Sequence, residues 1–190
     1  MDWGFIIFLV LIVGLVLYLI KIYNNLVALK HAVGQAWSNI EVLLKQRHDE
    51  LPKLVEVCKQ YMGYEQETLQ KVIQARSEVM QAQQQCDMKG FGAAEGMLRM
   101  GLGNLFALAE AYPDLKSNEQ FQHLQQRISG LENAIADRRE FYNASVNQNN
   151  VRIEQFPDVL VANYFSFGSF ELLEFDASET EDVNMETLFN

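Results

Sequence analysis

The chain has 190 residues, of which 49% are apolar and 21% charged, and its formal net charge at pH 7 is -10. This length suits one modest domain together with a membrane segment. The negative charge argues against nucleic-acid binding and against attraction to anionic lipid through the field of the whole chain. Attachment to a membrane must therefore be hydrophobic.

An uncharged apolar segment occupies residues 3–20. As a helix it reaches roughly 27 Å, close to the thickness of the hydrocarbon core. Trp3 at one end, and Lys21 and Tyr23 at the other, are typical interfacial anchors. A cleaved signal peptide is the alternative, but Asp2 stands where such a peptide is basic, and no small-residue cleavage site follows. The segment is therefore predicted to be an uncleaved anchor.

The predicted membrane-spanning residues are Gly4, Phe5, Ile6, Ile7, Phe8, Leu9, Val10, Leu11, Ile12, Val13, Gly14, Leu15, Val16, Leu17, Tyr18, Leu19 and Ile20. Basic residues near the ends of the span set its orientation. Lys21 and Lys30 follow the span, with Lys45 and Arg47 further along. We therefore expect the N-terminus outside and the body in the cytoplasm.

Long helices are expected in the body, because the chain has only three prolines. Apolar residues with alternating spacings of three and four follow the anchor: Leu26, Leu29, Val33, Ala36, Ile40 and Leu43. The anchor helix is therefore expected to continue to about Asp49. Asp49 is then predicted to cap a new helix that has Pro52 in its first turn.

The predicted second helix carries another heptad stripe, with Glu65 and Arg76 at two of its seam positions. The apolar members of the stripe are Leu51, Val55, Cys58, Met62, Leu69, Val72 and Val79. Residues 89–103 contain five glycines and are expected to form a flexible connection between helices. A phosphate-binding loop is the alternative, but the lysine-serine ending of a P-loop and a preceding strand are both missing.

The remaining helices are bounded by prolines. A short apolar helix over residues 102–112 is expected to stop at Pro113, and Ser117 or Asn118 to cap a long helix that ends before Pro157. The sequence thus predicts an all-α protein. Its N-terminal transmembrane helix continues into a long antiparallel bundle of three long helices plus a short one.

The predicted parts are the anchor 1–22, the helical bundle 23–157, an apolar C-terminal segment 158–175 and an acidic tail 176–190. The apolar segment is rich in aromatic and β-branched residues, so a short helix and an extended aromatic segment are alternative predictions for it. Packing on the bundle, contact with a neighbouring subunit and contact with the membrane interface are its possible roles. The acidic tail is expected to be disordered.

Candidate catalytic and metal-binding groups are few. His48, Asp49 and Glu50, with Glu56 about two turns on, come nearest to a metal cluster, but adjacent helical residues point about 100° apart. Cys58 lies on the apolar seam, where a buried and inert thiol is expected rather than a nucleophile. Cys58 and Cys86 are expected to be reduced, although one disulfide stays possible. No metal and no cofactor is predicted.

Charged residues near the helix contacts are expected to form ion pairs that set helix register, with an anion site as the alternative. The predicted structural polar residues are Arg47, His48, Asp49, Glu65, Arg76 and Arg138. Arginines at 47, 76, 138 and 139 are expected to face Glu41, Glu65, Glu110 and Glu132. Trp37 is expected in the core.

Several blocks keep a characteristic order and spacing from the anchor to about Phe175. They are Tyr23-Asn24, Ala36-Trp37-Ser38-Asn39-Ile40, Arg47-His48-Asp49, Leu51-Pro52, Ala75-Arg76, the run Glu110 to Lys116, Glu132-Asn133, Tyr142-Asn143 and Phe156-Pro157. In these blocks the chain resembles the LemA family of bacterial membrane proteins. It departs from the family at Tyr64, where a histidine is usual, and in its unusually apolar glycine-rich stretch.

The resemblance implies an N-terminal anchor in the bacterial inner (cytoplasmic) membrane and a helical cytoplasmic body, without a particular activity. The leading hypothesis is a non-enzymatic, self-associating scaffold for membrane organisation or envelope homeostasis. The alternative is an adaptor subunit for another membrane protein, such as a protease or a sensor. The third is a hydrolase using His48 or Cys58. Expected partners are membrane lipid and further copies of the chain, with no nucleic acid and no small-molecule substrate.

Overall fold

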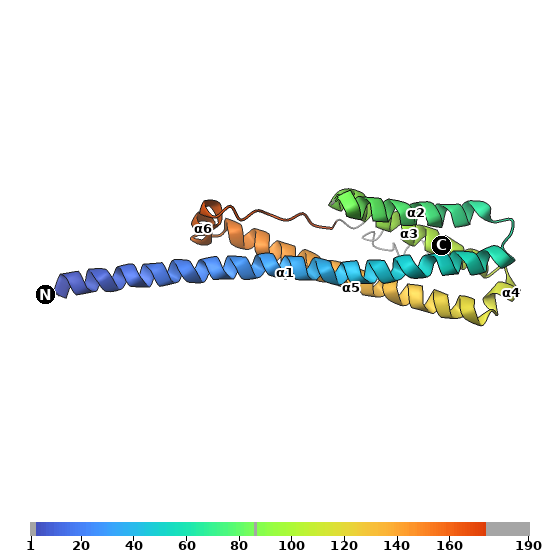
Figure 1. Cartoon of the computed structure of the whole chain (residues 1–190), viewed down its shortest axis with the longest axis horizontal. Helices are drawn as coiled ribbons and strands as arrows, with labels where there is room; N and C mark the ends of the chain where they lie inside the picture. The colour runs from blue at the N-terminus through green and yellow to red at the C-terminus, as the bar shows by residue number, and fades with distance from the viewer. Residues whose placement is uncertain (1–2, 86, 174–190) are drawn as a thin grey trace, which may run out of the picture. The chain divides into compact units, whose positions relative to one another are not determined.

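The computed structural model describes residues 3–85 and 87–173, which form α-helices and no β-strand, so the predicted all-α class is confirmed (Figure 1). The helices are α1 (Trp3–Tyr61), α2 (Gln66–Gln85), α3 (Met88–Ala109), α4 (Pro113–Lys116), α5 (Glu119–Glu154) and α6 (Asp158–Tyr164). They form two compact units. The described residues of unit 1 are 3–41 and 138–172, and those of unit 2 are 42–85, 87–137 and 173. The predicted acidic tail and Cys86 lie outside the described residues.

Unit 1 combines the first part of α1, the second part of α5 and the short helix α6. Trp37 of α1 packs edge-on against Tyr142 of α5, with 5.8 Å between ring centroids. Nearer the start of α1, Ile22 shares a small core with Ile153, which is nearer the end of α5. The two helices are therefore antiparallel. Trp37, expected in the core, is half-buried.

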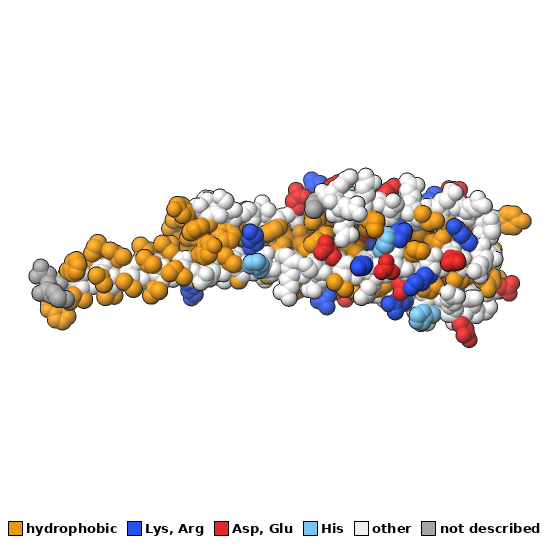
Figure 2. Space-filling view, in the orientation of Figure 1, with side chains coloured by type: hydrophobic (Ala, Val, Ile, Leu, Met, Phe, Trp, Pro, Cys, Tyr) orange, Lys and Arg blue, Asp and Glu red, His pale blue; other side chains and the backbone are white. Residues whose placement is uncertain are grey.

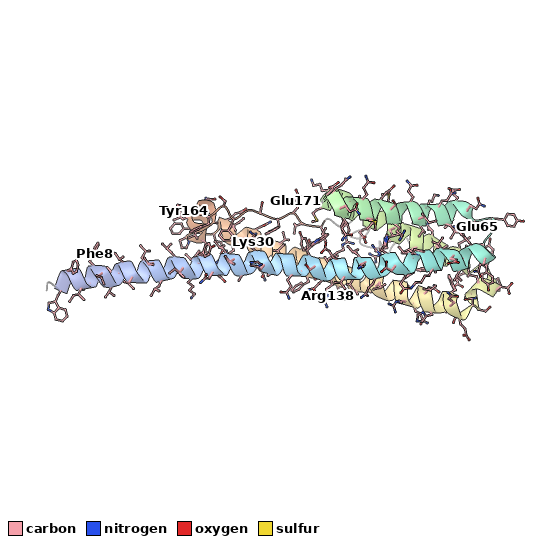
Figure 3. The ribbon with its side chains drawn as sticks, viewed as in Figure 1. Phe8, Lys30, Glu65, Arg138, Tyr164 and Glu171 are labelled. Atoms are coloured by element: carbon pink, nitrogen blue, oxygen red, sulfur yellow. The ribbon has the colours of Figure 1, made fainter. Side chains whose placement is uncertain are left out.

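The apolar N-terminal part of α1 is almost uncovered by the rest of the chain. Trp3 is 82% exposed and Leu11 is 67% exposed. Figure 2 shows this part as a continuous hydrophobic surface, and Figure 3 labels Phe8 within it. By length and composition, α1 is the one helix among the described residues that could cross a membrane.

Unit 2 contains the second part of α1, the helices α2, α3 and α4, and the first part of α5. Helices α2 and α3 pack side by side (Figure 1). The core is mainly aliphatic, and burying one such side chain contributes about 1.5–3 kcal/mol. Its fully buried side chains include Leu51, Leu54, Leu98, Leu102, Leu105 and Leu115, together with Phe91 and Phe121.

The predicted helix start at Asp49 is wrong, because α1 continues through Pro52 to Tyr61. A proline inside a helix removes the hydrogen bond to the carbonyl four residues earlier and costs about 3 kcal/mol or more. That carbonyl belongs to His48, and it accepts a hydrogen bond from Nε of Arg76 at 3.2 Å. A residue of α2 thus replaces the donor that Pro52 lacks.

The glycine-rich stretch is a helix, so the prediction of a flexible connection is also wrong. Asp87 caps α3 by accepting the N–H of Gly90 at 2.9 Å. A Cβ at Gly90 would lie 2.3 Å from Oδ2 of Asp87, so the Asp87 carboxylate would have to shift if another residue stood there. A Cβ at Gly101 would lie 3.4 Å from Cγ2 of Val72 on α2. Close packing on α2 stabilises α3 despite its glycines.

The turn between α3 and α5 follows the prediction more closely. The predicted helix over residues 102–112 is the end of α3 rather than a separate element, and Pro113 begins the one-turn helix α4. Oδ1 of Asn118 accepts the N–H of Phe121 at 2.9 Å, which confirms the predicted cap of α5.

Candidate functional site

A buried ion cluster joins three helices of unit 2. Nη1 of Arg47 on α1 donates to Oε2 of Glu95 on α3 at 2.8 Å and to Oε1 of Glu132 on α5 at 2.7 Å. Nη2 of Arg47 donates to the other carboxylate oxygen of Glu95, which makes that pair bidentate. The side chains of Arg47 and Glu95 are only 2% and 3% exposed, and that of Glu132 is 16% exposed.

Burial alone would lower the pKa of Arg47, but the neighbouring charges of Glu95 and Glu132 outweigh it and raise that pKa above its usual value. The guanidinium is therefore permanently charged, and both carboxylates are committed to it. Arg47 and Glu132 both belong to the arginines and glutamates that the sequence was expected to bring together, although no individual pair was predicted. Glu95 was missed, although a single carboxylate in a glycine-rich apolar run is the signal that marks it.

His48 and Arg76 form a second polar contact between α1 and α2. Arg76 Nη2 lies 2.5 Å from Nε2 of His48. A guanidinium only donates, so Nε2 of His48 is the acceptor and the ring is neutral. Burial first, and then the charge of Arg76, lower the pKa of His48. The sequence had placed Arg76 opposite a glutamate, and contact with His48 was not among its expected interactions.

The other predicted polar residues have separate environments. Glu65 accepts a hydrogen bond from the hydroxyl of Tyr112 at 3.2 Å. Asp49 and Arg138 are both exposed. Arg139, the residue next to Arg138, is buried, with 5% exposure. Adjacent helical residues point about 100° apart, so Arg138 and Arg139 face different surroundings although they are neighbours in the sequence.

The residues weighed for chemistry do not gather into a reactive site. Cys58 is fully buried, and burial raises its pKa to about 12. Glu50 is paired with Nζ of Lys53 at 3.0 Å and with Nε of Arg127 at 2.9 Å. Within residues 3–85 and 87–173, no three carboxylate, histidine or cysteine side chains come together as a metal site would require.

In unit 1, side-chain amides of α5 hold the segment that follows α6. Asn150 accepts the N–H of Phe170 at 3.0 Å and donates to the carbonyl of the same residue at 2.9 Å. Asn149, which is 1% exposed, donates to the carbonyl of Gly168 at 3.3 Å. The hydroxyl of Tyr142 donates to the carbonyl of Glu171 at 3.1 Å. These two asparagines were not singled out from the sequence, where their only signal is their clustering near the end of α5.

Three relatives share the sequence over most of this chain. Magnetosome protein MamQ 2 of Paramagnetospirillum magneticum is 25% identical over 179 residues, covering 82% of this chain and 64% of its own length. Magnetosome protein MamQ of Magnetospirillum gryphiswaldense is 25% identical over 169 residues, covering 77% of this chain and 62% of its own. The chain therefore spans slightly less than two thirds of these relatives. Protein LemA of Metamycoplasma hominis is 28% identical over 185 residues, covering 96% of this chain and 82% of its own.

The structure is that of an all-helical protein in which one apolar helix could cross a membrane. Buried ion pairs such as Arg47–Glu95 join its helices. The model of the LemA family matches residues 36–186. The chain belongs to the LemA family, so the resemblance seen in the sequence is confirmed.

Proposed function

We propose that the chain is a non-enzymatic, single-pass membrane protein that associates with further copies of itself as a scaffold. The exposed apolar part of α1 supports the membrane attachment, because so much uncovered apolar surface is unfavourable in water. The orientation expected from Lys21 and Lys30, with the body in the cytoplasm of a bacterial cell, belongs to the same proposal.

The environments of the two reactive candidates support a non-enzymatic role. A thiolate is the nucleophilic form of cysteine, and the raised pKa of Cys58 keeps it protonated at neutral pH. His48 is engaged through Nε2 with Arg76, and its carbonyl is engaged as well. Both residues therefore serve the packing of unit 2.

The observation that carries self-association is an exposed stripe on α3, here called the α3 stripe. Its members recur at spacings of four and three, which is the heptad pattern of a coiled-coil seam. They are Ala93, Met97, Met100, Asn104 and Ala107, all exposed. In such a seam, a single asparagine among apolar positions specifies register and oligomer state. The exposed Gly103 beside the stripe leaves room for a close helix, because a Cβ there would have no atom within 4 Å.

A shallow groove of about 310 Å³ runs beside the α3 stripe, with Ala75 and Glu78 of α2 on its other side. Met97 and Met100, which are 45% and 56% exposed, form its wall on α3. A helix laid on the stripe would bury both methionines and contact the polar rim of α2. The α3 stripe of a second copy has the matching apolar face.

The test is the size of the full-length protein in mild detergent, with chemical cross-linking in native membranes. We expect a discrete oligomer, and dissociation when Met97→Glu and Met100→Glu are combined. Val42→Glu is the matched control, because Val42 is 57% exposed on α1, outside the stripe. A particle that is monomeric at all concentrations would contradict the proposal.

An adaptor role is the second candidate, and the exposed methionines favour it, since methionine surfaces accept helices of varied sequence. In that case the native protein would purify with a stoichiometric second membrane protein. The paired Met97 and Met100 substitutions would then remove that protein, while the size of the isolated chain would stay the same.

A further inference from the structure

The outer face of α6 is apolar and exposed. The α6 outer face is defined here as Phe156, Leu160, Tyr164 and Phe165, which are 81%, 61%, 81% and 53% exposed. Leu160 and Tyr164 are spaced by four residues and lie on one side of the helix. Phe156 precedes the helix, and Phe165 directly follows it. The helix has one charged residue, Asp158, which is 2% exposed and paired with Nε of Arg152. The outer face therefore presents a large apolar surface without a charge.

The inner face of α6 fixes the position of the helix on α1. Val161 and Ala162 pack with Ile22 and Leu26, which are 3% and 0% exposed. The ring of Tyr23 lies 4.8 Å from that of Phe165 between centroids. These contacts hold α6 against the turn of α1 that directly follows the predicted span. Figure 3 labels Tyr164 on this helix.

A groove of about 550 Å³ lies between α6 and α1. Its wall on α1 consists of Leu19, Ile20 and Tyr23, and its wall on α6 includes Leu160 and Tyr164. Among the described residues that line it, none has a charged side chain, and the side-chain polar groups are the hydroxyls of the two tyrosines. Leu19 and Ile20 are also the last two residues of the predicted span. Figure 2 shows the hydrophobic surface of α1 continuing onto α6.

We propose that the α6 outer face lies in the headgroup–acyl boundary at the point where α1 leaves the bilayer, and that the groove holds phospholipid acyl chains. This inference rests on the proposed membrane attachment. Aromatic rings and leucine on one face of a short helix are typical of segments that lie in the plane of the interface. The span and α6 would then form one continuous lipid-facing surface.

Lipid fits this surface better than a second copy of the chain. A protein interface has a polar, hydrogen-bonding rim around its apolar centre. The groove lacks a charged rim, and one of its walls belongs to a segment that itself requires hydrocarbon around it. A bilayer supplies acyl chains at that depth without any further partner.

Depth-dependent quenching of tryptophan tests the proposal in the full-length chain. Trp3→Phe and Trp37→Phe together remove both native tryptophans. Single probes are then introduced as Phe165→Trp, Leu160→Trp or Leu11→Trp, and each protein is reconstituted in phosphatidylethanolamine–phosphatidylglycerol vesicles that contain brominated phospholipid. Phe141→Trp is the matched control, because Phe141 is also 53% exposed in unit 1 but lies on α5 beside Tyr142.

Bromines near the headgroup should quench the Phe165→Trp and Leu160→Trp probes strongly, and deep bromines should quench them less. Leu11→Trp should show the reverse order, and Phe141→Trp should keep its emission. If Leu11→Trp is quenched while both α6 probes match Phe141→Trp, the inference is wrong and the membrane attachment stands. If Leu11→Trp is not quenched, the attachment itself fails. Blue-shifted α6 probes that bromines do not quench would indicate a covering protein and overturn the lipid assignment.

Discussion

Arg76 Nε donates a hydrogen bond of 3.2 Å to the carbonyl oxygen of His48, the acceptor that Pro52 leaves without its helical donor. The same guanidinium reaches Nε2 of the His48 side chain. A side chain of α2 thereby stabilises a proline in the interior of α1. The arrangement links His48 and Arg76, which belong to consecutive helices.

The Arg76–Pro52 relationship predicts non-additive substitutions. Arg76→Ala should destabilise unit 2 by about 1–3 kcal/mol, because it leaves the His48 carbonyl without a donor. In a Pro52→Ala background the same substitution should cost less, since residue 52 then donates to that carbonyl itself. Urea unfolding of the four proteins in mild detergent, followed by circular dichroism, measures the coupling as a double-mutant cycle.

A matched control for this cycle is Arg99→Ala, which removes an exposed arginine from α3. Its effect should be the same with and without Pro52. Equal costs of Arg76→Ala in the two backgrounds would show that the guanidinium does not compensate for the proline.

The buried ion cluster should be far more sensitive to partial than to complete replacement. Arg47→Met leaves Glu95 buried without its cation and should cost about 3–5 kcal/mol. Adding Glu95→Leu and Glu132→Gln to Arg47→Met should recover most of that loss, because no buried charge remains. Thermal unfolding of the single and triple variants measures the difference. A triple variant no more stable than the single one would contradict this expectation.

Unit 2 should lose stability as the pH falls through the range in which unfolded histidine binds a proton. The pKa of His48 is lowered in the folded protein, first by burial and then by Arg76. Below a pH of about 6.5 the unfolded state therefore binds more protons than the folded state. The stability present above this pH is lost as the pH falls toward the lowered pKa of His48 in the folded protein. Hydrogen exchange of α1 and α2 between about pH 7.5 and pH 5.5 measures this change.

His48→Gln keeps an acceptor for Arg76 but does not titrate, so it should flatten the pH dependence. His123→Gln is the control, since His123 is exposed on α5. A pH dependence unchanged by His48→Gln would assign the effect to another group.

Ser166 offers a site for stabilisation, because its φ is 57° at the end of α6. The N–H of Phe167 donates to the carbonyl of Ala162 at 2.9 Å, and that of Ser166 to the carbonyl of Asn163 at 3.4 Å, which together form a Schellman motif. Glycine has no Cβ penalty in this conformation, so Ser166→Gly should stabilise the α6 region by about 1 kcal/mol. Slower hydrogen exchange in α6 is the expected result. Ser169→Gly in the same segment should give no such protection.

The apolar periodicity of the sequence predicted the helical class and the seam position of Cys58, and its turn residues predicted a cap at Ser117 or Asn118. Periodicity reports which face of a helix is buried, and it is the strongest signal in such a chain. The sequence also singled out Arg47, His48, Glu65 and Arg76, each of which makes a polar contact in the structure.

Local rules failed where a distant residue overrides them. Proline at a first helical turn is the usual pattern, and nothing near Pro52 indicates that Arg76 will satisfy the carbonyl of His48. Glycine-rich sequence is locally a poor helix former, and α3 is helical because it packs on other elements, for example where Gly101 lies against Val72 of α2. Glu95 was missed for the same reason, because its partner is contributed by another helix.

The two hydrogen bonds between Asn150 and Phe170 close residues 150–170 into a loop with fixed ends. Each end of α6 is thus tied to α5, whatever the state of the helix itself. Detachment of α6 from α1 would be an intramolecular step, and the short tether would keep its effective concentration high. We expect local opening of α6 to be rapidly reversed. Loss of Asn149 or Asn150 should therefore lengthen the lifetime of the open form, with a smaller effect on the structure of the closed form.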